Sequence, residues 1–119
     1  MAFEFSLSSN AVTVNPDGTV SVTITQTSSD PQAVQYGVNS LFNGGWDAPA
    51  FLDQFGNVTY AFSPTPARIT GNGTLTLTFS ASSAVASQTL VVTVFALQQM
   101  TGDPKSTVSA QATVTLAVT

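Results

Sequence analysis

The amino-acid sequence predicts an all-β protein, an antiparallel β-sandwich of about seven to eight strands. Apolar residues alternate with Thr or Ser in one short segment after another, which is the period of a strand that buries one face. Gly, Pro, Asn, Asp or Ser separate these segments, as is usual at turns. Because a sheet with one buried face needs a second sheet to cover it, we expect two packed sheets. The 119 residues are enough for a single domain over positions 1–119.

Three alternating segments lie in the first half of the chain. Val12 and Val14 flank Thr13, and the sequence Asn-Pro-Asp-Gly at 15–18 then reverses the chain, with Asp-Gly supplying the left-handed position. The segment at 20–25 places apolar residues on one face and Ser or Thr on the other, so we expect one buried and one solvated face. In the third segment the apolar alternation falls on Val34, Tyr36 and Val38.

Three further alternating segments and one continuous apolar run lie in the second half. The alternating segments are at 58–62, 75–79 and 108–118, and the two prolines of the sequence Ser-Pro-Thr-Pro end the first of them. The run at 90–97 is far shorter than the roughly 20 residues that cross a bilayer. Its β-branched residues favour a strand in the core, and we expect no membrane span.

The composition argues against catalysis and against nucleic-acid binding. The chain has no His and no Cys, two Lys or Arg, and six Asp or Glu, for a net charge of -4. Without His, Cys or a Ser-Lys motif, hydrolytic schemes other than a pair of carboxylates lack a general base, and without Cys neither disulfides nor a thiolate metal site can form. Two cations among six carboxylates cannot neutralise a phosphate backbone. We therefore expect no enzyme activity, no cofactor and no nucleic-acid partner.

Six segments, in order along nearly the whole chain, carry a recognisable pattern of Thr and Val. They are FSLS at 5–8, VTV at 12–14, GTVSVTI at 18–24, VTYAFSP at 58–64, LTLTF at 75–79 and TLVVTV at 89–94. Together they resemble the immunoglobulin-like domains of bacterial and archaeal cell-surface proteins, secreted enzymes and phage virions. The resemblance implies an immunoglobulin-like sandwich and no catalytic residue. The chain departs from that family in an insertion at 39–57, and it lacks the Cys pair and core Trp of antibody-type domains.

The insertion at 39–57 concentrates aromatic side chains and is where we expect an individual function. It holds the only Trp and three of the eight Phe. The candidate binding residues are Phe42, Trp46, Phe51 and Phe55, with Trp46 stacking on a sugar ring or entering a pocket on a partner protein. The alternative is a lid whose aromatic residues fold down over an open end of the sandwich, since exposed clusters of this size are uncommon on monomers.

The acidic residues suggest two further hypotheses. Asp47 and Asp53 lie in the same insertion, and a glycosidase uses two carboxylates at a fixed separation. A calcium site needs several carboxylates that converge, but the chain has no Asp-x-Asp-x-Asp-Gly loop. Capping of turns is the ordinary role for such aspartates, so we expect no metal. The aspartates at expected turns are Asp17, Asp30, Asp47, Asp53 and Asp103.

The last expected strand, Val108 to Val118, contains no Lys, Glu or Pro. These residues usually protect the edge of a sheet, and an uncharged edge invites pairing with another chain. Two explanations stay open. Turns, bulges or the segment at 3–7 cover this edge within the chain, or a neighbouring subunit covers it by lateral packing or strand addition.

These observations predict a non-catalytic structural or interaction protein. The composition is cation-poor and rich in Thr and Ser, as in extracellular proteins, whereas the start at Met1 lacks the basic and apolar stretches of a secretory signal. We therefore expect a virion surface component, such as a capsid decoration or tail accessory protein. Its expected partners are copies of itself or a capsid or tail protein. The alternative is a carbohydrate-binding or spacer module of a secreted or cell-surface protein.

Overall fold

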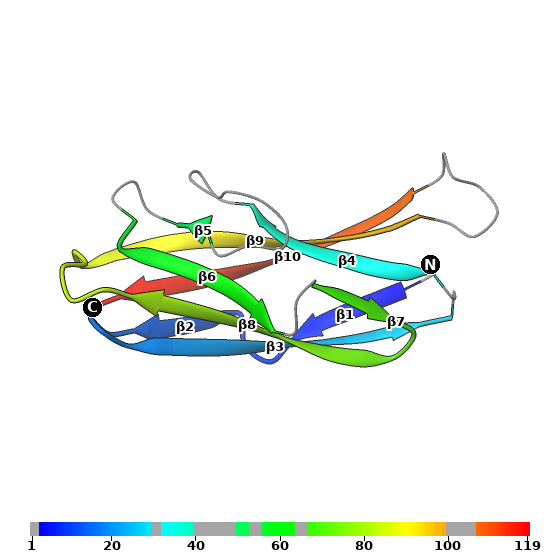
Figure 1. Ribbon diagram of the computed structural model, residues 1–119, viewed down its shortest axis with the longest axis horizontal. Coiled ribbons are helices and arrows are strands. Elements are labelled where there is room, and N and C mark those ends of the chain that lie inside the picture. The colour runs from blue at the N-terminus through cyan, green and yellow to red at the C-terminus, as the bar shows by residue number, and fades with distance from the viewer. Residues whose placement is uncertain (1–2, 30–31, 40–49, 53–55, 64–66, 100–106) are drawn as a thin grey trace.

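A computed structural model describes residues 3–29, 32–39, 50–52, 56–63, 67–99 and 107–119. Over these ranges the chain forms ten strands in two five-stranded sheets that pack face to face (Figure 1). The molecule measures 48 × 24 × 20 Å, and the C-terminus lies near one end of the long axis. The predicted all-β antiparallel sandwich is confirmed. The described residues contain no helix long and apolar enough to span a bilayer.

The first sheet, called sheet A here, has the strand order β1-β3-β8-β6-β5. All four neighbouring pairs in this sheet are antiparallel. Its strands are β1 (Phe3–Leu7), β3 (Thr19–Ser28), β8 (Gly73–Ala81), β6 (Val58–Ser63) and β5 (Ala50–Phe51).

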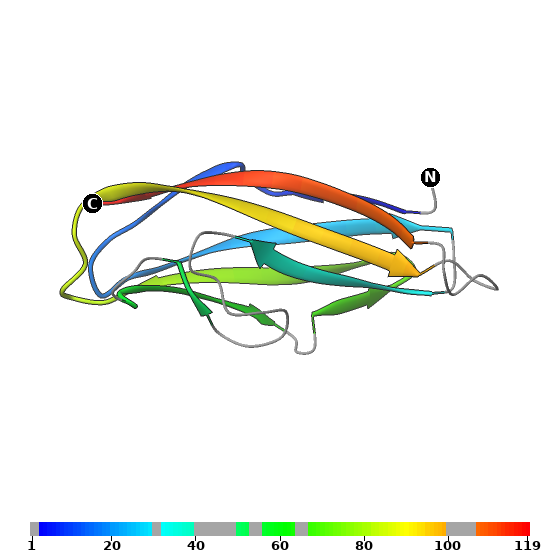
Figure 2. The ribbon, with the colours of Figure 1, turned by 90° about the horizontal axis from the view of Figure 1, so that it is seen from above.

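The second sheet, sheet B, has the strand order β2-β10-β9-β4-β7. Strands β2 and β10 are parallel, whereas the other neighbours are antiparallel. Figure 2 shows β9 and β10 side by side along most of the length of the molecule. The strands of sheet B are β2 (Ala11–Val14), β10 (Thr107–Val118), β9 (Gln88–Gln99), β4 (Ala33–Asn39) and β7 (Arg68–Thr70).

The core lies between the sheets and is filled by the residues that the alternation assigns to the inner faces. Each buried Val, Leu, Ile or Phe contributes about 1.5–3 kcal/mol by leaving water. Val12, Val20 and Ala110 are half-buried and pack against this core. The predicted inward residues that are buried are Val14, Val22, Ile24, Val34, Tyr36, Val38, Val58, Tyr60, Phe62, Leu75, Leu77, Phe79, Val114, Leu116 and Val118.

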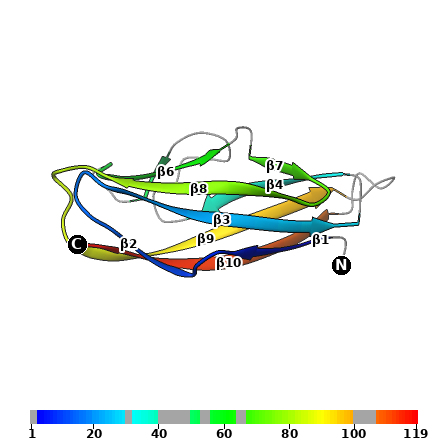
Figure 3. The same cartoon turned by 90° about the horizontal axis from the view of Figure 1, so that it is seen from below.

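The N-terminal part of the chain is divided between the two sheets. Strand β1 pairs with the second half of β3 in sheet A, and β2 pairs with the end of β10 in sheet B. Figure 3 shows β1 and β2 in opposite halves of the molecule. This division and the two short strands β5 and β7 raise the number of strands above the seven or eight that the sequence predicts.

Part of the insertion at 39–57 adds to the core. Strand β5 pairs with β6, and the backbone N–H of Leu52 donates to the carbonyl oxygen of Val58 at 2.7 Å. The Leu52 side chain is only 2% exposed. Strand β5 therefore lies on the edge of sheet A, and the Leu52 side chain is part of the core.

The turn at 15–18 joins β2 in sheet B to β3 in sheet A, so it connects the sheets instead of forming a hairpin. The N–H of Gly18 donates to the carbonyl oxygen of Asn15 at 2.8 Å. Asp17, with φ of 59°, occupies the left-handed position. Gly18 has a different role, because a Cβ atom there would lie 2.8 Å from the carbonyl oxygen of Asn15.

We expect the substitution Gly18→Ala to lower the unfolding free energy by about 1–3 kcal/mol, because the added methyl group overlaps a backbone oxygen that cannot rotate away. Urea unfolding measures this loss. Asp17→Gly is the matched control in the same turn, since glycine adopts a positive φ without strain. Equal stability of Gly18→Ala and the unmodified protein would contradict this account of the turn.

Candidate interaction surface

A buried polar pair joins the two sheets. The Tyr36 hydroxyl on β4 donates to Gln26 Oε1 on β3 at 2.6 Å. Gln26 Nε2 in turn donates to the carbonyl oxygens of Ile69 and Gly71, at 3.1 and 2.7 Å. Gln26 is not among the residues predicted from the sequence. Its position nevertheless continues the inward alternation of Val22 and Ile24, and Gln26 is the polar residue of that buried face.

Burial raises the pKa of the Tyr36 hydroxyl well above its usual value of 10.0. Strongly shifted pKa values often mark active sites that are open to substrate. Here the side chains of Gln26 and Tyr36 are 1% and 0% exposed, and each makes the hydrogen bonds described above. The pair therefore holds the sheets together and offers no access to a substrate.

We expect the unfolding free energy to decrease as the pH rises above 10. The folded protein keeps Tyr36 protonated, whereas the unfolded chain releases this proton near pH 10, so the contribution of Tyr36 is complete below that pH. One such group lowers the unfolding free energy by at most about 1.4 kcal/mol for each unit by which the pH rises. Denaturant unfolding between pH 8 and 11 measures it, and Tyr36→Phe is the control because it has no hydroxyl. If the unfolding free energy of Tyr36→Phe depended on pH in the same way as that of the unmodified protein, Tyr36 would not be the group responsible.

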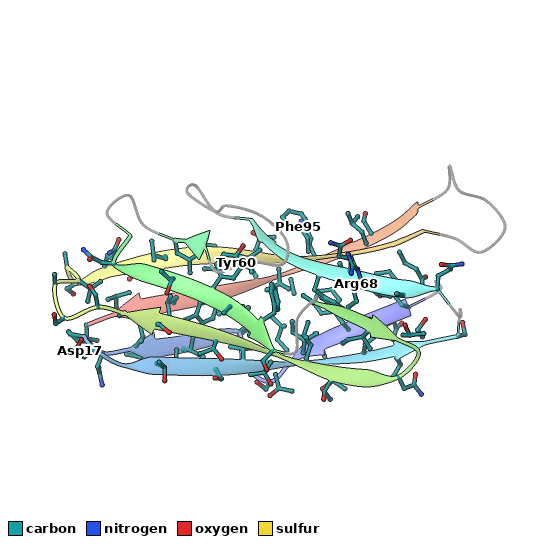
Figure 4. All side chains as sticks on the ribbon, in the orientation of Figure 1. Asp17, Tyr60, Arg68 and Phe95 are labelled. Atoms are coloured by element: carbon teal, nitrogen blue, oxygen red, sulfur yellow. The ribbon has the colours of Figure 1, made fainter. Side chains whose placement is uncertain are left out.

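Charged side chains are sparse on the described surface. Glu4, Asp17 and Arg68 are the charged residues in the described ranges, and all three are exposed. Figure 4 shows Asp17 near the C-terminal end of the molecule, well away from Arg68. No group of three His, Cys, Asp or Glu residues that could hold a metal ion occurs among the described residues. The other aspartates, including the Asp47 and Asp53 of the glycosidase hypothesis, lie outside them.

The outer face of sheet A is a surface of hydroxyl groups. On β3 and β8 every outward position is Ser or Thr, and the register places these residues opposite one another. Ser21 Oγ and Thr78 Oγ1 share a hydrogen bond of 3.0 Å across the two strands. Such a face is well solvated, and its β-branched residues suit the pleated surface. It is the solvated face that the sequence predicts.

The outer face of sheet B is different, because it presents apolar side chains along β9. Val91 is 62% exposed and Leu97 is 38% exposed, and Phe95 is half-buried between them. The prediction of a core strand at 90–97 is therefore correct for the inner side chains, such as Val92 and Val94, and wrong for the outer ones. We call Val91, Phe95 and Leu97 the apolar strip.

The neighbours of the apolar strip are uncharged or small. Phe95 lies opposite Gln111 on β10 and opposite Gly37 on β4, which has no side chain. Leu97 lies opposite Ser109 and Gln35. Arg68, the outward residue next to Gln35 on β7, is the charged residue that borders this face within the described ranges. Figure 4 labels both Phe95 and Arg68.

Strand β10 is covered on its outer edge only near its end. Strand β2 pairs with Thr115 to Val118, and no other described strand pairs with that edge from Thr107 to Val114. The segment at 3–7 does not pair with this edge, because it forms β1 and pairs with β3 in the other sheet, although β1 also contacts β10. A partly open edge remains.

The aromatic candidate site lies mostly outside the described residues. Phe42, Trp46 and Phe55 are not described, and for Phe51 the structure describes the backbone, which pairs with Thr59. A binding role for these four residues stays a prediction. The apolar strip was missed because its residues belong to an apolar run that resembles a fully buried strand.

Comparison with solved structures shows that the chain shares an immunoglobulin-like fold with chaperones and with a PapD-like domain. The chain superposes on the E. coli chaperone DraB with a TM-score of 0.55 and 16% identity, covering 98% of this chain and 54% of that one. For PapD-like domain 7 of human CEP192 the TM-score is 0.54 at 10% identity, with 97% and 84% covered. For the Pseudomonas aeruginosa chaperone CupB2 the values are 0.53 and 16%, with 96% and 55% covered.

The chain spans about half the length of the two chaperones that it resembles. At these sequence identities the likeness shows the fold alone. No protein-family model matches the chain, and a search of curated proteins found no match. The likeness to these solved structures confirms the immunoglobulin-like sandwich that the sequence resemblance implies.

Proposed function

We propose that this protein is a non-catalytic structural module that works by packing against other proteins. The observation that carries the proposal is the apolar strip, which exposes Val91 and Leu97 at the centre of a sheet whose described neighbours are uncharged apart from Arg68 at its border. Interface cores are depleted in charged residues and contain large apolar side chains. The fold likeness to chaperones, which act on other proteins, is consistent with this role.

The partner that suits this surface is a protein with an apolar, uncharged patch of its own. Aromatic Phe95 at the middle of the strip is the natural anchor, because buried aromatic side chains dominate interface energies. The outward positions of β3 and β8 in sheet A offer no such anchor, so among the described residues the outer face of sheet B is the surface suited to docking in this way. Contact through one face leaves the other exposed to solvent.

As the setting of this contact we propose a virion surface, with the chain acting as a capsid decoration or tail accessory protein. A small sandwich with two cations and six acids gains little from electrostatic attraction, so its docking depends on close packing against neighbouring subunits. A repetitive protein surface supplies many identical patches for such packing. The extracellular character of the composition suits this location.

The experiment is a co-sedimentation assay with virions and with cell envelopes from the source organism. We expect the labelled protein to sediment with virions, and the double variant Val91→Lys/Leu97→Lys to bind at least tenfold more weakly. Covering these two side chains is worth about 2 kcal/mol, and 1.4 kcal/mol is a factor of ten. Thr23→Lys/Thr76→Lys on the outer face of sheet A is the matched control.

Unimpaired binding of the strip variant would refute docking through sheet B. Sedimentation with cell envelopes but not with virions would refute the virion setting and favour a module of a cell-surface protein. Each result therefore bears on one part of the proposal.

The carbohydrate alternative has a direct spectroscopic test, because Trp46 is the only tryptophan. If a sugar ring stacks on Trp46, titration with soluble polysaccharides shifts or quenches the tryptophan fluorescence, and Trp46→Phe abolishes retention on a polysaccharide column. Protein docking through the apolar strip predicts no spectral change and no retention. Retention that depends on Trp46 would make carbohydrate binding the better assignment.

A further inference from the structure

We propose that β10 pairs in antiparallel fashion with β10 of a second copy of this chain, about a two-fold axis at Gln111. The pairing joins the two B sheets into one continuous sheet. It uses the edge of sheet B, whereas the docking proposed above uses its outer face. The inference therefore goes beyond that proposal and does not depend on it.

The open edge of β10 presents hydrogen-bonding groups that a second strand can satisfy. The N–H of Thr115 donates to the carbonyl oxygen of Asn10, which precedes β2, at 2.8 Å. In an extended strand the backbone groups of every second residue point to the same side. Those of Ser109, Gln111 and Thr113 therefore point to the side of Thr115, where no described strand pairs before Thr115.

The length of the open edge fits a second copy in one register. Strand β10 begins at Thr107, and β2 occupies the edge from Thr115 onward, so the open stretch runs from 107 to 114. An antiparallel copy centred on Gln111 pairs positions 108 to 114 within this stretch. Position 107 would face Thr115, whose edge β2 occupies, so the pairing ends at position 108. Gln111 then lies opposite Gln111 of the second copy, and Ser109 lies opposite Thr113. Each of these hydrogen-bonded pairs exchanges two backbone hydrogen bonds, so the open groups of Ser109, Gln111 and Thr113 are satisfied.

The side chains along this edge permit close approach on both faces. On the outer face the pairing brings amide to amide at Gln111 and hydroxyl to hydroxyl at Ser109 and Thr113, and all of these can both donate and accept. On the inner face Ala110 lies opposite Ala112 at a position where Cα atoms approach to about 4.5 Å. Both alanines are half-buried, so a second copy covers methyl groups that are now partly exposed.

Charge does not oppose the contact, although each copy has a net charge of -4. Strand β10 contains no charged residue, and neither does its neighbour β9. The exposed acids among the described residues, Glu4 and Asp17, belong to β1 and to the turn after β2. Monomeric proteins usually protect such an edge with Lys, Glu or Pro, and this edge has none of them. A neutral edge that is complementary to itself favours a second copy over a charged partner.

The test uses single cysteines, which are specific because the chain has none of its own. Gln111→Cys places two thiols opposite each other at the proposed axis. Cα atoms of such a pair lie about 5.5 Å apart, within the range of disulfides. We expect Gln111→Cys to form a covalent dimer under mild oxidation at least tenfold faster than Ser109→Cys or Thr115→Cys. These controls lie on the same outer face of β10 but not opposite their own copies.

The register is tested by mixing two variants. Because Ser109 lies opposite Thr113 of the second copy, Ser109→Cys and Thr113→Cys cross-link when mixed and not separately. Cross-linking at similar rates in all variants would overturn the proposal, since it would indicate random collision.

Light scattering behind a sizing column provides a second measurement on the protein without cysteines. At tens of micromolar we expect twice the chain mass of 12.3 kDa. Gln111→Pro should restore the monomer without unfolding it, because the N–H that it removes points to the open edge and not to β9. A monomer at every concentration would overturn the pairing. That result leaves docking through the apolar strip standing, because the strip is tested by different variants and a different assay.

Discussion

The division of the N-terminal strand between the two sheets decides which edges of this sandwich are closed. Backbone N–H and C=O groups at a sheet edge need partners, and β1 and β2 supply them to β3 and β10. Because the same stretch of chain serves both sheets in turn, it pairs with half of β3 and with a third of β10. The part of β10 from Thr107 to Val114 has no paired strand on its outer edge as a direct consequence.

The scarcity of charge determines what such an open surface can do. An edge or an outer face that carries charges of one sign repels a second copy and stays solvated. In sheet B the apolar strip and the uncharged edge of β10 lie next to each other, with Phe95 opposite Gln111. The two surfaces can therefore be covered together in an assembly, one by an apolar patch and the other by a strand. The hydroxyl face of sheet A remains in water.

The buried polar pair fixes the way in which the two sheets are packed. Apolar residues tolerate small shifts of one sheet over the other, but a buried amide must keep its hydrogen bonds. Gln26 on β3 contacts Tyr36 on β4 and the carbonyl oxygens of Ile69 and Gly71. This network connects strands of both sheets near β7, so it specifies one arrangement where the remaining core is largely aliphatic.

The sequence by itself determined the fold class and the inner faces, because the alternation of apolar and polar residues is a local property that each strand carries. It also determined which chemistry is missing, since no arrangement can supply absent His, Cys or cations. The tertiary structure decided the rest. Val91 and Leu97 are exposed because no described segment packs on the outer face of sheet B. The sequence pattern at 90–97 does not predict this exposure. Which part of β10 is open depends on where the chain crosses between the sheets after β1, which is a long-range choice of partner. The local pattern predicts which face of a strand is apolar, whereas only the tertiary structure shows which segments pack against that strand.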